Sequence, residues 1–254
     1  MIGLDAQNFH IFEGKEKQTI KYFSSEDSPV SIGIILDTSK SMGSKIEYAR
    51  QAVIEFLKAA NPQDEIFMIT FSTRPELVAD FTTSIEDIQS YLPFVNPKGT
   101  TALLDAIYLG ITKLRQAQYG KKALLVISDG GDNHSRYTEN EIKQFVREAD
   151  TVIYAIGIYD REFRSYEELF GPVLLDHVSR ETGGEMFIID NPKDCVNIAA
   201  KIGVALRHQY LLGYRPAIPK YVGKWHKIKV KVSPPQGLPR VDVHAKQGYY
   251  APTD

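Results

Sequence analysis

Residues 30–43 constrain the fold of this chain more than any other stretch. Residues 32–36 form an apolar run, which is typical of a buried strand, and a polar loop follows directly. That loop carries Asp37, Ser39 and Ser41 at every second position. Alternate side chains of an extended segment point to one side, so these residues are expected to form a cluster of oxygen atoms. Mg2+, Mn2+ and Ca2+ prefer oxygen ligands, whereas softer metals do not.

Two helix starts are indicated by S/T-x-x-E motifs. Ser44 and Glu47 match this capping box directly after the Asp37 loop, and Thr138 and Glu141 match it again farther along. In a capping box the two side chains bond to the free backbone N–H groups of the first helical turn. Helices are therefore expected to begin at both places.

The middle of the chain alternates between predicted strands and predicted helices. Besides residues 30–36, apolar segments typical of strands lie at residues 66–71, 123–127, 151–158 and 186–189, and an edge strand is expected at 77–81. Segments with helical spacing separate them. This alternation predicts an α/β fold with a doubly wound, mostly parallel sheet and helices on both faces. Ligands of such sheets bind at the carboxyl ends of the strands, where the Asp37 loop lies.

The two ends of the chain have a different pattern. Residues 9–23 are predicted to form a β-hairpin, and strands are expected at residues 210–214, 227–232 and 241–245. Neither set of strands could be stable alone, so we expect them to pair into one small antiparallel β appendage. The predicted organisation is an N-terminal β segment with a linker at 1–29, an α/β domain at 30–208 and a C-terminal β segment at 209–254.

Composition excludes several classes of protein. The formal net charge of −2 argues against a general binder of nucleic acids or membrane surfaces. Cys195 is the only cysteine, so neither an internal disulfide nor a cysteine-built zinc site can form. No apolar run approaches the length of a membrane span. The first residues lack the pattern of a signal peptide, so the chain is predicted to be cytoplasmic or a piece of a longer exported protein.

Three loops carry a combination of motifs that resembles the von Willebrand factor type A domains. The motifs are D-x-S-x-S with Asp37, Ser39 and Ser41, Gly-x-Thr ending at Thr101, and Asp-Gly beginning at Asp129. The resemblance covers residues 30 to about 208. The stretches 8–14, 209–216, 225–228 and 248–252 are also similar to a bacterial branch of that family, whose members are usually predicted to be exported. The resemblance therefore implies an extracytoplasmic location: periplasmic, secreted or on the cell surface.

The resemblance also implies a metal-ion-dependent adhesion site. Ser39 and Ser41 would bind the ion through their hydroxyls, and Thr101 would bind directly or through water. Asp37 and Asp129 would bind directly or hold coordinating waters. Mg2+ is the expected ion, with Mn2+ or Ca2+ as alternatives, and an open position would accept a Glu or Asp carboxylate from a protein partner. The implied function is non-catalytic, metal-dependent protein binding or adhesion.

Two other functions remain open from the sequence. A magnesium-dependent hydrolase or phosphotransferase could use Asp37 as a nucleophile. Against it, Ser39 replaces the second aspartate of an Asp-x-Asp motif, and no glycine-rich phosphate loop or G-x-S-x-G motif is present. The third reading is an adaptor subunit of a chelatase or ATPase complex, since such machines also use this type of domain.

Several other polar residues are expected to have ordinary structural roles. Asp105 would complement a helix N-terminus, and Asp132 and Asn133 would form a solvated turn rather than a second ion site. His134 is expected on the surface. The lysine stripe is expected to be a solvated strand face that blocks edge pairing; its members are Lys227, Lys229 and Lys231.

Overall fold

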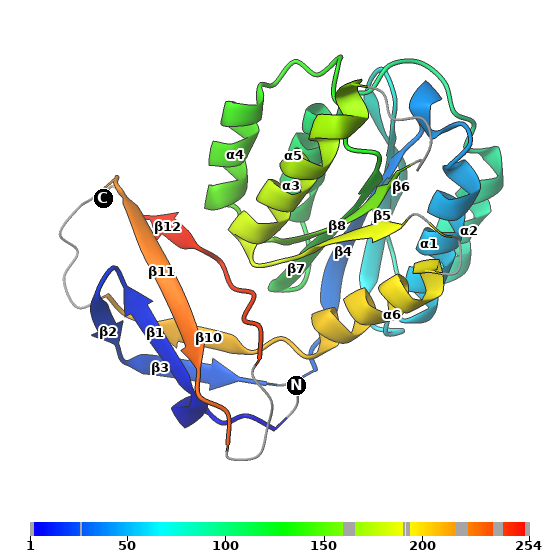
Figure 1. The fold of residues 1–254 in the computed structure, drawn as a ribbon. Coiled ribbons are helices and arrows are strands. Elements are labelled where there is room, and N and C mark those ends of the chain that lie inside the picture. Colours follow the sequence, from blue (N-terminus) through cyan, green and yellow to red (C-terminus); the bar gives the residue numbers. More distant parts are fainter. Residues whose placement is uncertain are drawn as a thin grey trace.

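A six-stranded sheet forms the centre of the α/β domain, and the strands from the two chain ends lie to one side of it (Figure 1). The computed structural model describes residues 3–25, 27–159, 166–189, 191, 194–216, 223–235 and 241–251. The strand order is β6-β5-β4-β7-β8-β9, with β6 antiparallel to β5 and the other neighbours parallel. The strands are β4 (Val30–Asp37), β5 (Glu65–Phe71), β6 (Pro75–Thr82), β7 (Lys121–Ser128), β8 (Val152–Ile158) and β9 (Met186–Ile189). This arrangement confirms the predicted doubly wound α/β fold, with β6 as an edge strand.

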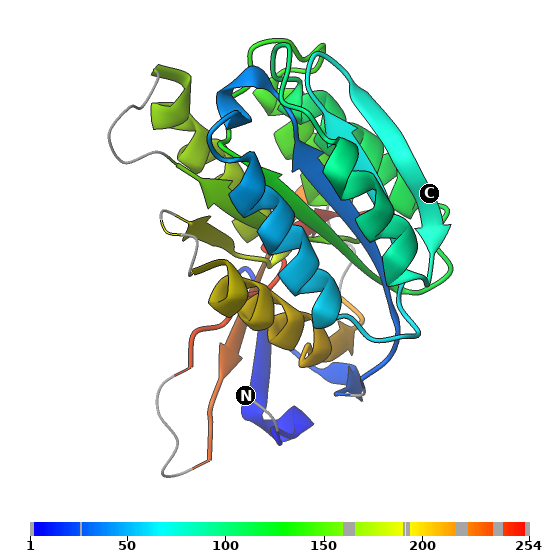
Figure 2. The same ribbon diagram turned by 90° about the vertical axis from the view of Figure 1, so that its right-hand side faces the viewer.

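Helices cover both faces of the sheet (Figure 2). One face packs against α1 (Ile46–Lys58), α2 (Ile85–Tyr91) and α6 (Asp194–Arg207). The other packs against α3 (Leu103–Leu114), α4 (Glu139–Glu148) and α5 (Tyr166–Thr182). The short 3-10 turns are η1 (Ala6–Asn8), η2 (Lys40–Met42) and η3 (Leu92–Phe94). Since both faces are covered, the central strands need apolar residues at successive positions.

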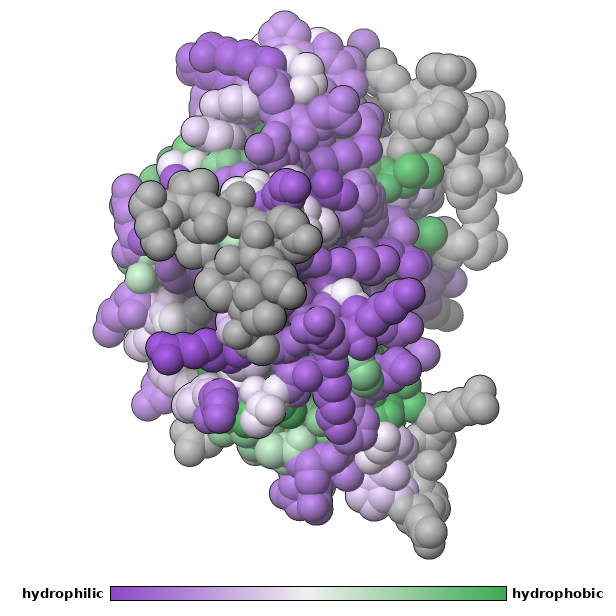
Figure 3. All heavy atoms as spheres, turned by 90° about the vertical axis from the view of Figure 1, so that its left-hand side faces the viewer, coloured by the Kyte–Doolittle hydropathy of each residue, from purple (hydrophilic) through white to green (hydrophobic). Residues whose placement is uncertain are grey.

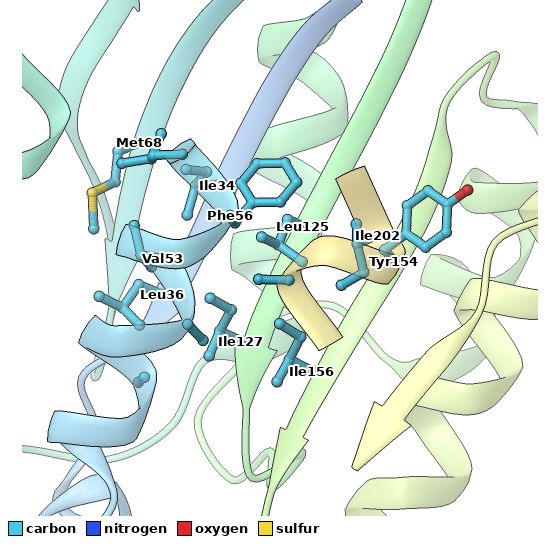
Figure 4. Packing of buried hydrophobic residues seen from close by; sticks show 14 of the residues in the cluster. Ile34, Leu36, Val53, Phe56, Met68, Leu125, Ile127, Tyr154, Ile156 and Ile202 are labelled. Atoms are coloured by element: carbon cyan, nitrogen blue, oxygen red, sulfur yellow. The ribbon is translucent and has the colours of Figure 1, made fainter. Parts of the chain in front are cut away.

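The two hydrophobic cores explain the apolar run of β4. Ile34 and Leu36 point into the core beneath α1 and α6, whereas Ile35 points into the core beneath α3 and α5. Figure 4 shows Val53 and Phe56 of α1 packed in the first core with side chains from β4, β7 and α6. All of these side chains are shielded from water, so burial of their apolar surface stabilises the sheet and its helices together.

One predicted capping box is confirmed and the other is wrong. Thr138 caps α4, and the carboxylate of Glu141 accepts the backbone N–H of Thr138 in return. At α1, however, the chain first turns through η2, and the helix begins only at Ile46. The position before it is Lys45, which makes no side-chain capping bond. The extra turn displaces Ser44 from the capping position.

The β appendage consists of strands from both ends of the chain. A four-stranded sheet has the order β12-β11-β1-β2, and a two-stranded sheet joins β10 to β3. Their bounds are β1 (Phe9–Glu13), β2 (Glu16–Gln18), β3 (Ile20–Ser24), β10 (Leu211–Tyr214), β11 (Trp225–Val232) and β12 (Gly248–Tyr250). Strand β1 runs antiparallel to β11, with Phe9 opposite Val232. The outer ends of the predicted segments 1–29 and 209–254 fall outside the described residues.

The structure corrects two sequence predictions for the appendage. Strands β1 and β2 form a hairpin as predicted, but it ends at Gln18, because β3 pairs with β10 instead. Residues 241–245 are not a strand. Lys246 Nζ bonds to Ala149 O at 3.0 Å, and Gln247 N bonds to Glu181 O at 3.4 Å. The segment is thus held along α4 and α5 of the α/β domain rather than within a sheet.

A carboxylate joins the two sheets of the appendage. Glu13 of β1 receives hydrogen bonds from the hydroxyls of Tyr214 on β10, at 3.0 Å, and Tyr249 on β12, at 3.4 Å. Nδ1 of His226 on β11 lies 2.5 Å from the other Glu13 oxygen. We call these four residues the Glu13 cluster. One side chain therefore connects four strands.

The surface in Figure 3 is mostly hydrophilic, with apolar residues in small separate groups. Among the described residues, the helices are too short or too polar to cross a membrane.

Arg207, at the end of α6, pairs with Asp27 before β4 and with Asp64 before β5. These ion pairs fasten the last helix to the base of the central sheet, at the point where the chain leaves for β10.

Candidate metal centre

The five residues predicted to bind a metal lie in three loops at one end of the sheet. Asp37 is the last residue of β4, Asp129 follows β7, and Thr101 lies just before α3. Asp37, Ser39, Thr101 and Asp129 are 0%, 1%, 4% and 1% exposed, whereas Ser41 is exposed. Buried carboxylates and hydroxyls need bonding partners in place of water. The hydrogen-bond and ion-pair partners of these residues therefore decide which kind of ligand the three loops can bind.

Hydrogen bonds fix the carboxylate of Asp37. One oxygen accepts the backbone N–H of Ser39 at 2.8 Å, and the other accepts the hydroxyl of Ser128 at 2.6 Å. The hydroxyls of Ser39 and Ser41 lie 3.0 Å apart. The alternating Asp-x-Ser-x-Ser spacing thus brings the oxygen atoms of Ser39 and Ser41 together. Ser128 was not identified from the sequence, because its partner lies 91 residues away.

Backbone hydrogen bonds tie the Thr101 loop to both other loops. Lys98 N donates to Thr38 O at 2.8 Å, and Lys40 N donates to Gly99 O at 3.3 Å. On the other side, Thr101 N donates to Asn133 Oδ1 at 2.9 Å. The three loops therefore form one connected framework.

Helix α5 touches this framework through two glycines. Gly130 has a φ of +78°, a conformation that favours glycine. A Cβ atom on Gly130 would lie 2.6 Å from the backbone of Gly171, and one on Gly171 would lie 2.5 Å from Asp129 O. The approach is between backbones, so neither residue could carry a side chain without displacing α5 or the Asp129 loop.

The electrostatics of the cluster favour an added cation. Burial, and after it the nearby negative charge of Asp129, raise the pKa of Asp37 to about 7. Hydrogen bonds from Ser128 and Ser39 oppose the shift but do not outweigh it. Two carboxylates close together in a medium of low dielectric constant repel each other. A bound cation would relieve both the burial cost and the repulsion.

Lys45 is a member of the cluster that sequence reasoning missed. Its Nζ lies 3.0 Å from Asp129 Oδ2, and the two side chains are 4% and 1% exposed. A sequence signal existed, since a lysine at the start of a helix is unfavourable to the helix dipole. Such a residue is expected to have another partner, although the sequence alone does not name it. Lys45 supplies one positive charge against the two carboxylates.

The donor set fits a hard divalent cation. Two carboxylates and three hydroxyls are ligands of the kind that Mg2+ accepts, and Mg2+ tolerates sites that leave it several waters. In the part of the chain that the structure describes, no cluster of three or more His, Cys, Asp or Glu residues offers another centre. Lys45 would share Asp129 with an ion bound there.

The other polar residues of these loops support the backbone. Asp132 accepts Leu104 N at 3.2 Å and the hydroxyl of Ser135 at 2.6 Å, so it serves the first turn of α3. Asp105 accepts the backbone N–H of Arg136 at 2.8 Å. It therefore holds the loop before α4 rather than the start of its own helix. His134 is exposed, as predicted. The lysine stripe of β11 is also exposed: Lys227, Lys229 and Lys231.

Comparison with known proteins identifies the type of domain to which these loops belong. Residues 32–131, which include all five candidate ligands, match the model of the von Willebrand factor type A domain. An uncharacterised protein from Borreliella burgdorferi is 24% identical over 184 residues, which is 63% of this chain and 54% of that protein. Human inter-alpha-trypsin inhibitor heavy chain H4 is 26% identical over 153 residues, which is 54% of this chain and 16% of that protein. The chain thus spans about half of the first relative and a small part of the second.

Solved structures share the fold at low identity. A von Willebrand factor type A protein from Catenulispora acidiphila aligns with a TM-score of 0.58 at 16% identity, covering 72% of this chain and 43% of that one. An aerotolerance-related membrane protein from Bacteroides fragilis aligns with a TM-score of 0.55 at 17% identity, covering 69% and 99%. The pilus adhesin SpaC from Lactobacillus rhamnosus GG aligns with a TM-score of 0.56 at 13% identity, covering 80% and 34%.

The sheet order and the two helical layers define a doubly wound α/β domain, and the three loops place the candidate ligand residues at the carboxyl ends of its strands. Together with the family match, they show that the chain contains a von Willebrand factor type A domain.

Proposed function

We propose that this chain is a non-catalytic protein-binding module whose affinity depends on a divalent cation. The cation, Mg2+ in the first instance and Mn2+ or Ca2+ as alternatives, binds in the cluster formed by Asp37, Ser39, Ser41, Thr101 and Asp129. A Glu or Asp carboxylate of a protein partner then completes its coordination. The observation that carries the proposal is the pair of buried aspartates, whose mutual repulsion leaves the site short of positive charge.

Four of the five candidate ligands have parts that follow from their contacts. The hydroxyls of Ser39 and Ser41, 3.0 Å apart, are neutral ligands that leave the charge of the ion largely uncompensated. Asp37 is held in place by Ser128 and balances part of that charge. Asp129 balances more of it while paired with Lys45. Because few of the ligands are charged, the ion keeps enough positive charge to attract a further carboxylate.

The proposed location is outside the cytoplasm. The structures that share the fold include a membrane protein related to aerotolerance and a pilus adhesin. An adhesive module of this kind requires access to its partner at a cell surface. Cell fractionation of the organism that makes the protein, with an antibody against the chain, would test this part of the proposal.

Titration of metal-stripped protein with Mg2+, Mn2+ and Ca2+ tests the metal site directly. Saturable heat is expected for wild type and should disappear in Asp37→Ala. Asp242→Ala, which removes an exposed carboxylate distant in sequence from the loops, is the control and should bind like wild type. Circular dichroism must show that Asp37→Ala is folded. Absence of binding in both calorimetry and thermal shift, at millimolar concentrations of all three ions, would refute the proposal.

The non-catalytic part has its own test. Wild type with Mg2+ is assayed on p-nitrophenyl phosphate and p-nitrophenyl acetate, and no turnover above background is expected. Turnover that disappears in Ser39→Ala would show that the site is an enzyme centre and would overturn the reading as a pure binding module.

A further inference from the structure

A groove runs beside the metal-site loop, between the β5–β6 hairpin and α2. Its volume is about 270 Å3, and its walls include Thr38, Arg74, Tyr91, Phe94 and Lys98. No part of the proposed metal chemistry uses these residues. The groove opens at the end of the sheet that carries the three loops, because Thr38 lies between Asp37 and Ser39 in the chain.

The groove and the candidate metal site share a wall. Both the backbone N–H and the hydroxyl of Thr38 donate to Phe71 O, at 2.7 and 2.9 Å. Lys98 N donates to Thr38 O at 2.8 Å. Thr38 is therefore fixed on both sides, and its neighbours Asp37 and Ser39 are fixed with it. A segment that reached the metal from this side would pass over Thr38.

Two aromatic side chains are presented to solvent at the far side of the groove. Phe94 is 79% exposed and Tyr91 is 40% exposed. The cause is local, since Leu92 and Val95 on either side of Phe94 are 3% and 7% exposed and anchor the η3 turn to the core. The anchored turn holds Phe94 outward. A rigidly presented aromatic ring buries large area on binding at little cost in conformational entropy.

The charges around the groove favour an acidic partner. Lys98 and Arg74 line it, and Lys40 is exposed on the adjoining metal-site loop. Among the described residues of the lining, Glu76 is the one acidic residue, and it is already paired with Arg74 at 3.0 Å. Positive charge therefore exceeds negative charge on this side of the candidate site, although the whole chain is slightly acidic. Such complementarity selects a partner and speeds its association.

We propose that this groove binds the partner residues that flank the metal-coordinating carboxylate. The occupant is an extended acidic segment of a protein, in which a large apolar side chain near the carboxylate packs against Phe94 and Tyr91. Lys98 and Lys40 contact further acidic groups of the same segment. The inference rests on the proposed function, and it names the class of partner: an acidic segment with an aromatic or large aliphatic residue close to its Asp or Glu.

A set of fluorescent nonapeptides provides the probe. Each peptide has a Gly/Ser background, an Asp at its centre and one Glu as a second acidic residue. Across the set, a single Phe is moved through the positions from four before the Asp to four after it. Matched peptides carry Ala for Phe or Asn for the central Asp. Fluorescence anisotropy with wild type and Mg2+ is expected to select Asp–Phe peptides of one spacing over both matched controls.

Variants then separate the groove from the metal site. Phe94→Ala and Lys98→Glu are each expected to weaken the selected peptide about tenfold, as truncation of an interface anchor does. Calorimetric Mg2+ affinity should remain unchanged in both. Tyr22→Ala, which removes an exposed ring of the appendage, is the matched control and should bind like wild type. Asp37→Ala should abolish both peptide and Mg2+ binding.

The outcomes distinguish the two proposals. If peptides need Asp37 and Mg2+ but bind Phe94→Ala and Lys98→Glu as tightly as wild type, the groove inference is wrong and the proposed function stands. If no Phe-containing peptide exceeds its Ala control while Mg2+ still binds, the groove inference is again wrong. If Phe94→Ala and Lys98→Glu weaken peptide binding, but Asp37→Ala and chelation of Mg2+ leave it unchanged, the groove acts without the metal. That result would overturn both the link between groove and metal and the proposed function.

Discussion

Lys45 Nζ lies 3.0 Å from Asp129 Oδ2, and both side chains are almost completely buried. The pair connects the start of α1 to the loop after β7, so it joins two of the three loops that form the candidate metal site. In the absence of a metal it supplies the positive charge nearest to Asp129. Removal of both charges from water is costly unless they are paired. A divalent cation bound at the candidate site would share Asp129 with this ammonium group.

Substitution of Lys45 by Met should therefore lower the stability of the metal-free protein but raise its affinity for Mg2+. Metal-free Lys45→Met is expected to lose about 3 kcal/mol of unfolding free energy, because a buried carboxylate loses its partner. Its affinity for Mg2+ should rise on the order of tenfold, since the ion no longer competes with the ammonium group. Urea denaturation and calorimetric titration measure the two effects.

Lys40→Met is the control for that prediction. Lys40 lies in the same loop but is exposed, so its loss should leave stability unchanged. A Lys45→Met variant that binds Mg2+ more weakly than wild type would show that Lys45 positions Asp129 for the ion rather than competing with it.

Metal binding should depend on pH through Asp37. The pKa of Asp37 is raised to about 7 by burial and by Asp129, and Mg2+ binds the ionised carboxylate. The affinity for Mg2+ is therefore expected to fall as pH decreases below about 7, approaching tenfold per unit. A constant affinity between pH 5 and pH 8 in calorimetric titrations would contradict this assignment.

The same shift predicts how metal-free protein responds to pH. Because the folded-state pKa of Asp37 is higher than its unfolded value, the group contributes stability that is fully present below that unfolded value. This contribution is lost as pH rises through about 7. Saturating Mg2+ should remove the loss, which thermal unfolding across the pH range would detect. The dependence should be absent in Asp37→Asn.

A methyl group at Gly171 should disturb the candidate metal site from a distance. The added Cβ would lie 2.5 Å from Asp129 O, so α5 or the Asp129 loop must move. Gly171→Ala is expected to cost about 1–3 kcal/mol and to weaken Mg2+ binding. Gly120→Ala, where an added Cβ meets nothing within 4 Å, is the matched control. Equal behaviour of the two variants in urea denaturation would contradict the close approach.

Removal of the Glu13 carboxylate should loosen the β appendage without affecting the metal site. Glu13→Ala leaves Tyr214, Tyr249 and His226 without their common partner. We expect a loss of about 1–3 kcal/mol and faster hydrogen exchange in the appendage strands. Glu16→Ala, at an exposed position of β2, is the control. A change in Mg2+ affinity in Glu13→Ala would contradict the independence of the two sites.

Much of the α/β domain could be predicted from the sequence because its signals are local. The run at residues 32–36 is apolar at successive positions because β4 is covered on both faces. The cap at Thr138 was predicted because both partners of the motif lie within one turn. The five candidate ligands were selected by a resemblance in three loops, and the structure adds the bonds between those loops.

Most of the errors and omissions arise where a distant partner decides. Ser44 is an exception: it satisfies the capping motif, but the neighbouring η2 turn moves the helix start to Ile46. Lys45 and Ser128 find their partners 84 and 91 residues away, and no local pattern reports such a contact. Residues 241–245 alternate like a strand, yet the following Lys246 is bonded to the end of α4. Tertiary contacts decide the outcome at Lys45, at Ser128 and in residues 241–245.

The pairing of β1 with β11 has a consequence for the order of folding. Asn8 and Ser233 are bonded to each other across 225 residues of chain, and the whole α/β domain lies between them. Contacts between such distant residues form slowly unless the intervening chain is already compact. We therefore expect the α/β domain to fold first and to bring the ends together. The appendage would close last and open first, so its strands can exchange their amide hydrogens while β4 stays protected.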